Sequence, residues 1–145
     1  METTSYYAYI IFKSLNINTD FPTEVITNKL GIEPTSTMRK GESINKIHKQ
    51  SFTYWEYQTD TFATWDINDA LKSILIIFDD KVDVINDLRN LLNVYVHIQI
   101  VTTIINGETP TLGISSNFVT FASAINASID IDMFIDPFTI LEENI

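Results

Sequence analysis

Residues 94–103, VYVHIQIVTT, carry the alternation from which the fold is predicted. Aliphatic side chains stand at every second position, Val94, Val96, Ile98 and Ile100, and alternate with Tyr95, His97, Gln99 and Val101. Because successive side chains of a strand point to opposite faces, this segment is predicted to be a half-buried strand. A sheet buried on one face is typical of antiparallel sheets with helices packed against them.

Two helices are predicted before this strand. Asp66 would cap the first, whose apolar stripe is Ala70, Leu71, Ile74, Leu75 and Phe78, and the second covers roughly residues 81–92. Asp79, Asp83 and Asp87 recur every four residues, and on one continuous helix these like charges would repel one another. We therefore expect a break near Asp79 and Asp80, with Asp80 as the cap of the second helix.

The remaining segments complete the predicted order of elements. After the strand we expect a turn at 106–110, a short strand around 111–115, a helix capped by Ser115 or Ser116, and a last strand at 128–134. Before the two helices we expect strands at 5–13, 35–41 and 51–59, with a helix that starts near Pro22. The order β-α-β-β-α-α-β-β-α-β predicts an α+β fold, one domain over residues 1–145, with helices packed on a mainly antiparallel sheet.

The stretch GIEPTSTMRKGE, residues 31–42, combines a helix stop with a basic pair. Gly31 suits the left-handed residue that ends a helix, and Pro34 prevents its continuation. On the following strand Arg39 and Lys40 would face opposite sides, and Gly41 would permit a turn or a bulge.

The basic pair has two interpretations, and both end at a negative group. An inward Arg39 would need a carboxylate from the fold, for which Asp130 or Asp132 is a candidate, since a buried charge is costly unless paired. Alternatively Arg39 and Lys40, with Trp55 as a wall, would bind a small anion or carboxylate.

Several short motifs resemble a known family. They are Leu30-Gly31-Ile32 with Pro34-Thr35, then Arg39-Lys40-Gly41-Glu42, a strand with Trp55, and the ending Ile129-Asp130-Ile131-Asp132 followed by Phe134. Over nearly its whole length the chain resembles the bacterial family catalogued as domain of unknown function 4279. The resemblance implies a small single-domain bacterial protein without an established activity, and it supplies no catalytic residues. Analogy with other small acidic α+β proteins suggests an immunity role, the neutralisation of a toxin.

Composition and charge limit the classes of partner. The net charge of −10 argues against nucleic-acid binding and against docking on anionic lipid. The charge is uneven, because residues 51–145 hold three Lys/Arg against fourteen Asp/Glu, a net of −11. The chain has no cysteine, no basic n-region and no apolar run near the roughly 20 residues that span a bilayer, so we expect a cytoplasmic protein.

The residues with possible chemistry do not form a catalytic motif. His48 and His97 lack HExxH spacing and a GxSxG context, so we predict no metal site and no catalytic residue. The glycines are too scattered for a phosphate loop, and no cofactor is expected. Asp130 and Asp132 point to one face of a strand, where they could hold a hard cation, but charged residues that protect an edge strand are the favoured interpretation.

These observations favour a non-enzymatic module that binds a protein with a basic surface, of immunity or inhibitor type. The predicted contact residues are Asp79, Asp80, Asp83 and Asp87. The alternatives are a small-ligand or regulatory module around Arg39, Lys40 and Trp55 and, third, a metal-dependent hydrolase using Asp130 and Asp132.

Overall fold

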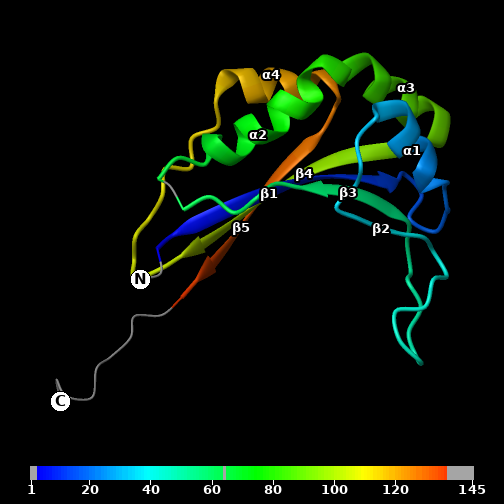
Figure 1. Cartoon of the computed structure of the whole chain (residues 1–145), viewed down its shortest axis with the longest axis horizontal. Coiled ribbons are helices and arrows are strands. Elements are labelled where there is room, and N and C mark those ends of the chain that lie inside the picture. Colours follow the sequence, from blue (N-terminus) through cyan, green and yellow to red (C-terminus); the bar gives the residue numbers. More distant parts are fainter. Residues whose placement is uncertain (1–2, 64, 137–145) are drawn as a thin grey trace.

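The computed structural model describes residues 3–63 and 65–136, which form one five-stranded sheet covered on one side by helices (Figure 1). The strands are β1 (Ser5–Ser14), β2 (Ser36–Met38), β3 (Tyr54–Gln58), β4 (Val94–Ile104) and β5 (Ser128–Ile135). The helices are α1 (Thr23–Leu30), α2 (Asn68–Phe78), the single 3-10 turn η1 (Asp79–Lys81), α3 (Val82–Leu92) and α4 (Ser116–Ala124).

The sheet has the strand order β2-β3-β1-β4-β5. The pairs β2–β3, β1–β3 and β1–β4 are antiparallel, whereas β5 runs parallel to β4 after the crossover through α4. The elements from β1 to β4 thus have the split β-α-β arrangement of ferredoxin-like folds, to which α4 and β5 add one further strand. The predicted α+β class with a mainly antiparallel sheet is confirmed.

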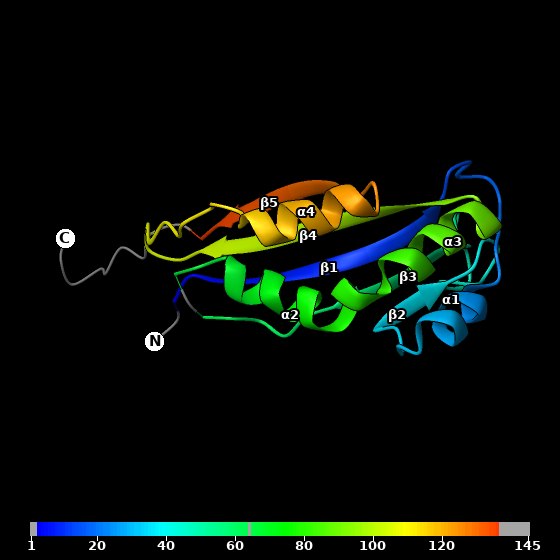
Figure 2. The same cartoon turned by 90° about the horizontal axis from the view of Figure 1, so that it is seen from above.

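One apolar core lies between the sheet and the helices, which all cover the same face (Figure 2). The even-numbered side chains of β1 and β4 point into it, and Ile10, Ile98 and Ile100 are fully buried. Trp55 from β3 meets Phe12 and Phe78 edge to face, with ring centroids 5.5 and 6.5 Å apart. The one-sided alternation of residues 94–103 is therefore explained by helices on a single face.

Three local predictions need correction. The N-cap of α2 is Ile67 and not Asp66, although Asp66 Oδ1 accepts from the N–H of Asn68 at 2.9 Å. Around residues 111–115 there is no named strand, only an isolated bridge between Asp66 and Thr111. The break between the two helices is present as η1, but Asp80 does not cap α3, because Lys81 takes the N-cap position without a side-chain bond. The 3-10 turn carries the chain from α2 into α3, so α3 begins without a separate capping residue.

Within residues 3–63 and 65–136, the helices are all too short to span a membrane.

Candidate functional site

The four aspartates predicted to contact a partner lie on the outer side of η1 and α3. Asp79 and Asp80 belong to η1, Asp83 and Asp87 to α3, and all four are exposed. Asp83 and Asp87 lie four residues apart on α3, and Asp79 precedes them on η1, so the three form an acidic stripe that crosses the break at Lys81 instead of following one continuous helix. Asp80 has one neighbouring cation, with its Oδ1 at 3.5 Å from Nζ of Lys81.

A groove runs beside this stripe, between α4 and the α2–η1–α3 segment. It measures about 440 Å³ and is lined by Leu75, Asp79, Val82, Asn117, Thr120, Phe121 and Ala124. Leu75, Val82 and Phe121 give it apolar walls, and Asp79 places a carboxylate in it. The α4 side carries no charged residue at all, since its sequence is SNFVTFASA. We call this site the acidic groove: a hollow lined by both polar and apolar side chains, with the carboxylate of Asp79 in its wall.

Two asparagines hold α4 at its distance from the other helices. At one end Asn68 donates from Nδ2 to the carbonyl of Gly113 and accepts from the N–H of Ser115, both at 2.9 Å. At the other end Asn86 donates to the carbonyl of Ala124 at 3.0 Å. The groove is therefore fixed at both ends by hydrogen bonds and does not depend on a ligand to form.

The start of α4 is a second determinant of the groove. Ser115 is its N-cap and accepts from the N–H of Phe118 at 3.3 Å. The prediction named Ser115 or Ser116 as the cap, and Ser115 is the one observed. Phe118, Phe121, Ala122 and Ile125 are buried, which confirms the predicted inward face. The groove itself could not be predicted from the sequence, because no local pattern tells that α4 lies beside α2 and α3.

Arg39 has a carboxylate partner within the fold, but it is Asp20 rather than Asp130 or Asp132. Nη2 of Arg39 lies 2.7 Å from Oδ2 of Asp20, and Nε donates to Oδ1 at 3.2 Å. Asp130 and Asp132 lie on β5, at the edge of the sheet opposite to β2, so they cannot reach Arg39. Thr53 also donates to Asp20, at 2.5 Å. The hydrogen bonds from Arg39 and then Thr53 hold the pKa of Asp20 at about 2.

The alternative ligand site around Arg39, Lys40 and Trp55 is not assembled. Trp55 lies in the core at 0% exposure and donates from Nε1 to Thr27 Oγ1 at 3.0 Å, so the prediction that it forms the wall of a site is wrong. Arg39 and Lys40 follow β2, which ends at Met38, so the prediction that they face opposite sides of a strand is wrong: Lys40 reaches the same loop as Arg39, with Nζ donating to the carbonyl of Asn18 at 2.7 Å. Together with the Asp20 pair, these bonds tie the loop before α1 to the chain that leaves β2.

The predicted structural positions are placed as follows. Gly31 ends α1 with φ of 68°, and its N–H donates to the carbonyl of Thr27, which confirms the helix stop. Gly41 also has a positive φ, 92°, where the chain turns after β2. Pro34 follows the helix end and is half-buried. Asp130 and Asp132 are exposed on the edge strand β5.

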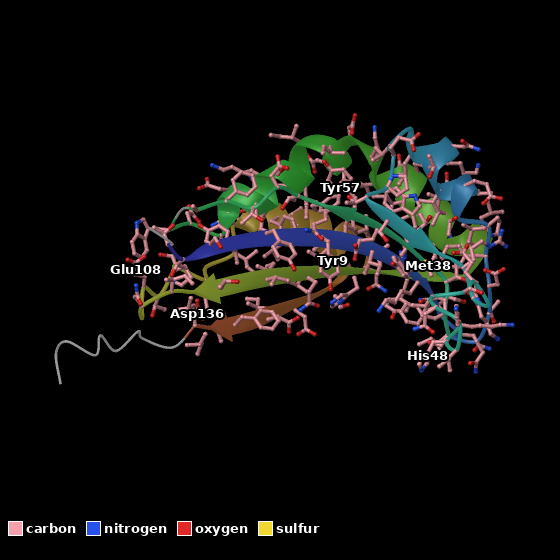
Figure 3. The ribbon with its side chains drawn as sticks, turned by 60° about the horizontal axis from the view of Figure 1, so that its bottom comes forward. Tyr9, Met38, His48, Tyr57, Glu108 and Asp136 are labelled. Carbon is pink, nitrogen blue, oxygen red and sulfur yellow. The ribbon has the colours of Figure 1, made fainter. Side chains whose placement is uncertain are left out.

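The sheet face away from the helices carries polar and aromatic side chains that sequence reasoning did not connect. Tyr9 lies on this face (Figure 3), opposite Gln99 on β4. Burial raises the pKa of Tyr9, with further contributions from the charges of Glu56 and Asp132. Burial also raises the pKa of Glu56, against the opposing effect of Lys13. The alternating patterns of β1 and β4 indicate which of their residues lie on this face. Which residues of different strands lie side by side can be told only from the order of the strands in the sheet.

Each histidine lies in a different part of the molecule. His97 has Ser128 Oγ 2.6 Å from Nδ1 and Gln99 Oε1 2.7 Å from Nε2, a polar network on the open sheet face. That a serine lies beside His97 could not be predicted from the sequence, because Ser128 comes from β5. None of these three residues lines the groove. His48 lies at the far end of the β2–β3 connection (Figure 3). Among residues 3–63 and 65–136, no group of three or more His, Asp and Glu could hold a metal ion.

Comparison with known proteins gives one match. The family model described as Domain of unknown function (DUF4279) matches residues 4–136, nearly the whole chain. No curated protein and no solved structure matches it.

Proposed function

The chain belongs to the DUF4279 family, and we propose that it is a non-enzymatic protein-binding module of immunity or inhibitor type. Its partner is a protein with a basic surface, which it covers with the acidic groove. The observation that carries the proposal is the combination in one place of apolar walls, Leu75, Val82 and Phe121, with the carboxylate of Asp79. The proposed site of action is the cytoplasm of a bacterial cell, on the ground of the cysteine-free composition.

The two parts of the site have different tasks in this proposal. An apolar side chain of the partner enters the groove and supplies most of the binding free energy, as buried anchors do in protein interfaces. The exposed carboxylates of Asp79, Asp83 and Asp87 attract Lys and Arg around that anchor, which raises the association rate more than the affinity. Inhibition follows from steric blocking, because the protein covers the basic surface that a toxin or enzyme would use.

Ile76 is an exposed apolar residue outside the groove. Its side chain is 82% exposed on α2, three residues before Asp79 of η1. An isoleucine exposed this far, close in the chain to a carboxylate, is suited to a partner that presents apolar and basic groups together.

The test is capture of partners by the tagged full chain, followed by mass spectrometry, with three forms of the protein. The groove variant is Asp79→Asn with Asp83→Asn. The matched control is Asp130→Asn with Asp132→Asn, which changes the net charge equally but alters exposed residues on β5. We expect a stoichiometric basic protein with the wild type and with the control, and its loss with the groove variant.

Binding kinetics with the purified partner then test the mechanism. Its association rate should fall as salt rises and should fall several-fold in the groove variant at low salt. A partner that binds the groove variant as well as the wild type, or that both double variants lose equally, would contradict the proposal.

No second function is proposed for the basic pair. The two donors of Arg39 that face Asp20 are already occupied, and Trp55 is in the core.

A further inference from the structure

The chain between β2 and β3 forms an ordered arm, residues 39–53, that projects from the end of the sheet (Figure 1). Its two sides are joined by hydrogen bonds between Gln50 and the pair Gly41 and Glu42, at 2.9 and 2.7 Å. At the tip, Asn45 Oδ1 accepts from the N–H groups of Ile47 and His48 at 2.9 and 2.8 Å. The arm therefore has a defined shape, and its root is bonded to the loop before α1 through Arg39, Lys40 and Thr53.

The tip of the arm combines apolar and basic side chains. Ile44 is 56% exposed, and Ile47, at 85%, has the highest exposure among the large apolar residues that the structure describes. Lys46 and Lys49 are exposed beside them. The arm holds Arg39, Lys40, Lys46 and Lys49 against a single acidic residue, Glu42, in a chain of net charge −10. Loop tips are more often polar, so a rigid tip with two isoleucines is suited to contact with another surface.

The acidic groove has the complementary chemistry. It offers the side chains of Leu75, Val82 and Phe121 for an isoleucine and the carboxylate of Asp79 for a lysine. Asp83, exposed one residue after Val82, adds a second negative charge on the same segment. The arm cannot reach the groove of its own molecule. Figure 1 shows the arm extending below the sheet while α2, α3 and α4 lie above it, and Figure 3 places His48 at the tip far from the helices.

We propose that the arm of one copy of this chain docks into the acidic groove of a second copy. The inference rests on the proposed function, since it assigns an occupant to the same groove. In the docked state Ile47 enters between α4 and α2–α3, and Lys46 and Lys49 meet the aspartates of η1 and α3. The pre-formed turn at Asn45 lowers the entropic cost of this contact.

The contact joins two different surfaces, so it is heterologous and leaves each end molecule with a free arm or a free groove. A hairpin tip also covers much less area than the roughly 1,600 Å² of a standard stable interface. We therefore infer weak, concentration-dependent association that a basic partner displaces. The arm of a second copy would thus cap the groove when the partner is absent.

Sedimentation velocity at protein concentrations up to the millimolar range tests this with two variants of the full chain. Each variant keeps only one of the two surfaces, the arm or the groove. The arm variant is Lys46→Glu with Ile47→Ser, and the groove variant is Asp79→Lys with Asp83→Lys. Each should be monomeric alone. Mixed, they should form a dimer of twice the chain mass that grows no further, because only one intact arm and one intact groove remain.

Two controls carry the same chemical changes elsewhere. Lys29→Glu with Ile17→Ser matches the arm variant, and Glu33→Lys with Asp60→Lys matches the groove variant; all four residues are exposed and lie outside the sheet. The controls should associate as the wild type does. A monomeric wild type, a mixture that forms no dimer, or equal loss of association in variants and controls would each overturn the proposal.

The same variants separate this inference from the proposed function. A chain that captures a groove-dependent basic partner but stays monomeric overturns self-docking alone. A chain that self-associates through arm and groove but captures no groove-dependent partner overturns the proposed function alone.

Discussion

Asp20 joins the loop before α1 to the root of the arm through hydrogen bonds from Arg39 and Thr53. We expect Asp20→Asn to lower the free energy of unfolding at pH 7 by about 0.5–1 kcal/mol, a small value because the ion pair is partly exposed. The folded pKa of about 2 lies below the ordinary 3.8. The stabilisation is therefore complete above the unfolded pKa and is lost as the pH falls through the folded one. Urea unfolding of both proteins should show a constant difference from neutral pH to about pH 5 that shrinks towards pH 2.

Asp130→Asn is the control for this measurement, because Asp130 is exposed on β5. A difference that shrinks equally for both variants would show that general acid effects, not the Arg39 pair, are responsible. The need of Arg39 for a carboxylate followed from its chemistry, and the structure provides one. Its partner could not be identified, since Asp20 lies 19 positions away in a loop whose position depends on where α1 crosses the sheet.

Among the elements, the end of α1 at Gly31 can be compared with the loop at Gly113, because both glycines are exposed and only Gly31 has a positive φ. Gly31 has φ of 68° at the end of α1, and an added Cβ would meet nothing within 4 Å. Gly113 has no such backbone conformation, and its Cβ would stand 4.0 Å from Thr111 Cγ2. Gly31→Ala should therefore destabilise the protein by about 1 kcal/mol through the left-handed backbone alone, and Gly113→Ala should be nearly neutral. Thermal unfolding of both variants would measure this, and equal stabilities would refute the backbone argument.

The elements that were predicted correctly are those with a long, strong period. The strand at 94–103 and the helix over 81–92 each repeat their pattern through most of their length, and burial on one face is enough to explain them. Residues 111–115 are too short for such a pattern. A strand at these residues would need a neighbouring strand to pair with. Of the β-type pairing that the structure describes, residues 111–115 have the single bridge between Asp66 and Thr111.

At the scale of the whole molecule, the acidic residues were predicted but the hollow beside them was not. The aspartates follow from the sequence, whereas the groove depends on Asn68 and Asn86 holding α4 beside α2 and α3. These asparagines act between elements that are distant in the chain. Charge can therefore be predicted from composition, and the shape of a site cannot.

The edge strand β5 has a free side at which a second molecule could pair with it. Its unpaired edge runs from Ser128 to Ile135, and Ile135 is 71% exposed. Asp130 and Asp132 stand between apolar residues there and oppose pairing with a second β5, because antiparallel pairing would bring like charges together. Asp130→Val with Asp132→Val should therefore cause association that salt does not reverse and that the arm variant does not prevent. Light scattering against concentration would measure it, with Glu33→Val and Asp60→Val as a control of equal charge change at exposed positions outside the sheet. Scattering no greater than that of the control would mean that the two aspartates do not protect the edge, and that another feature, such as the twist of the strand, keeps β5 unpaired.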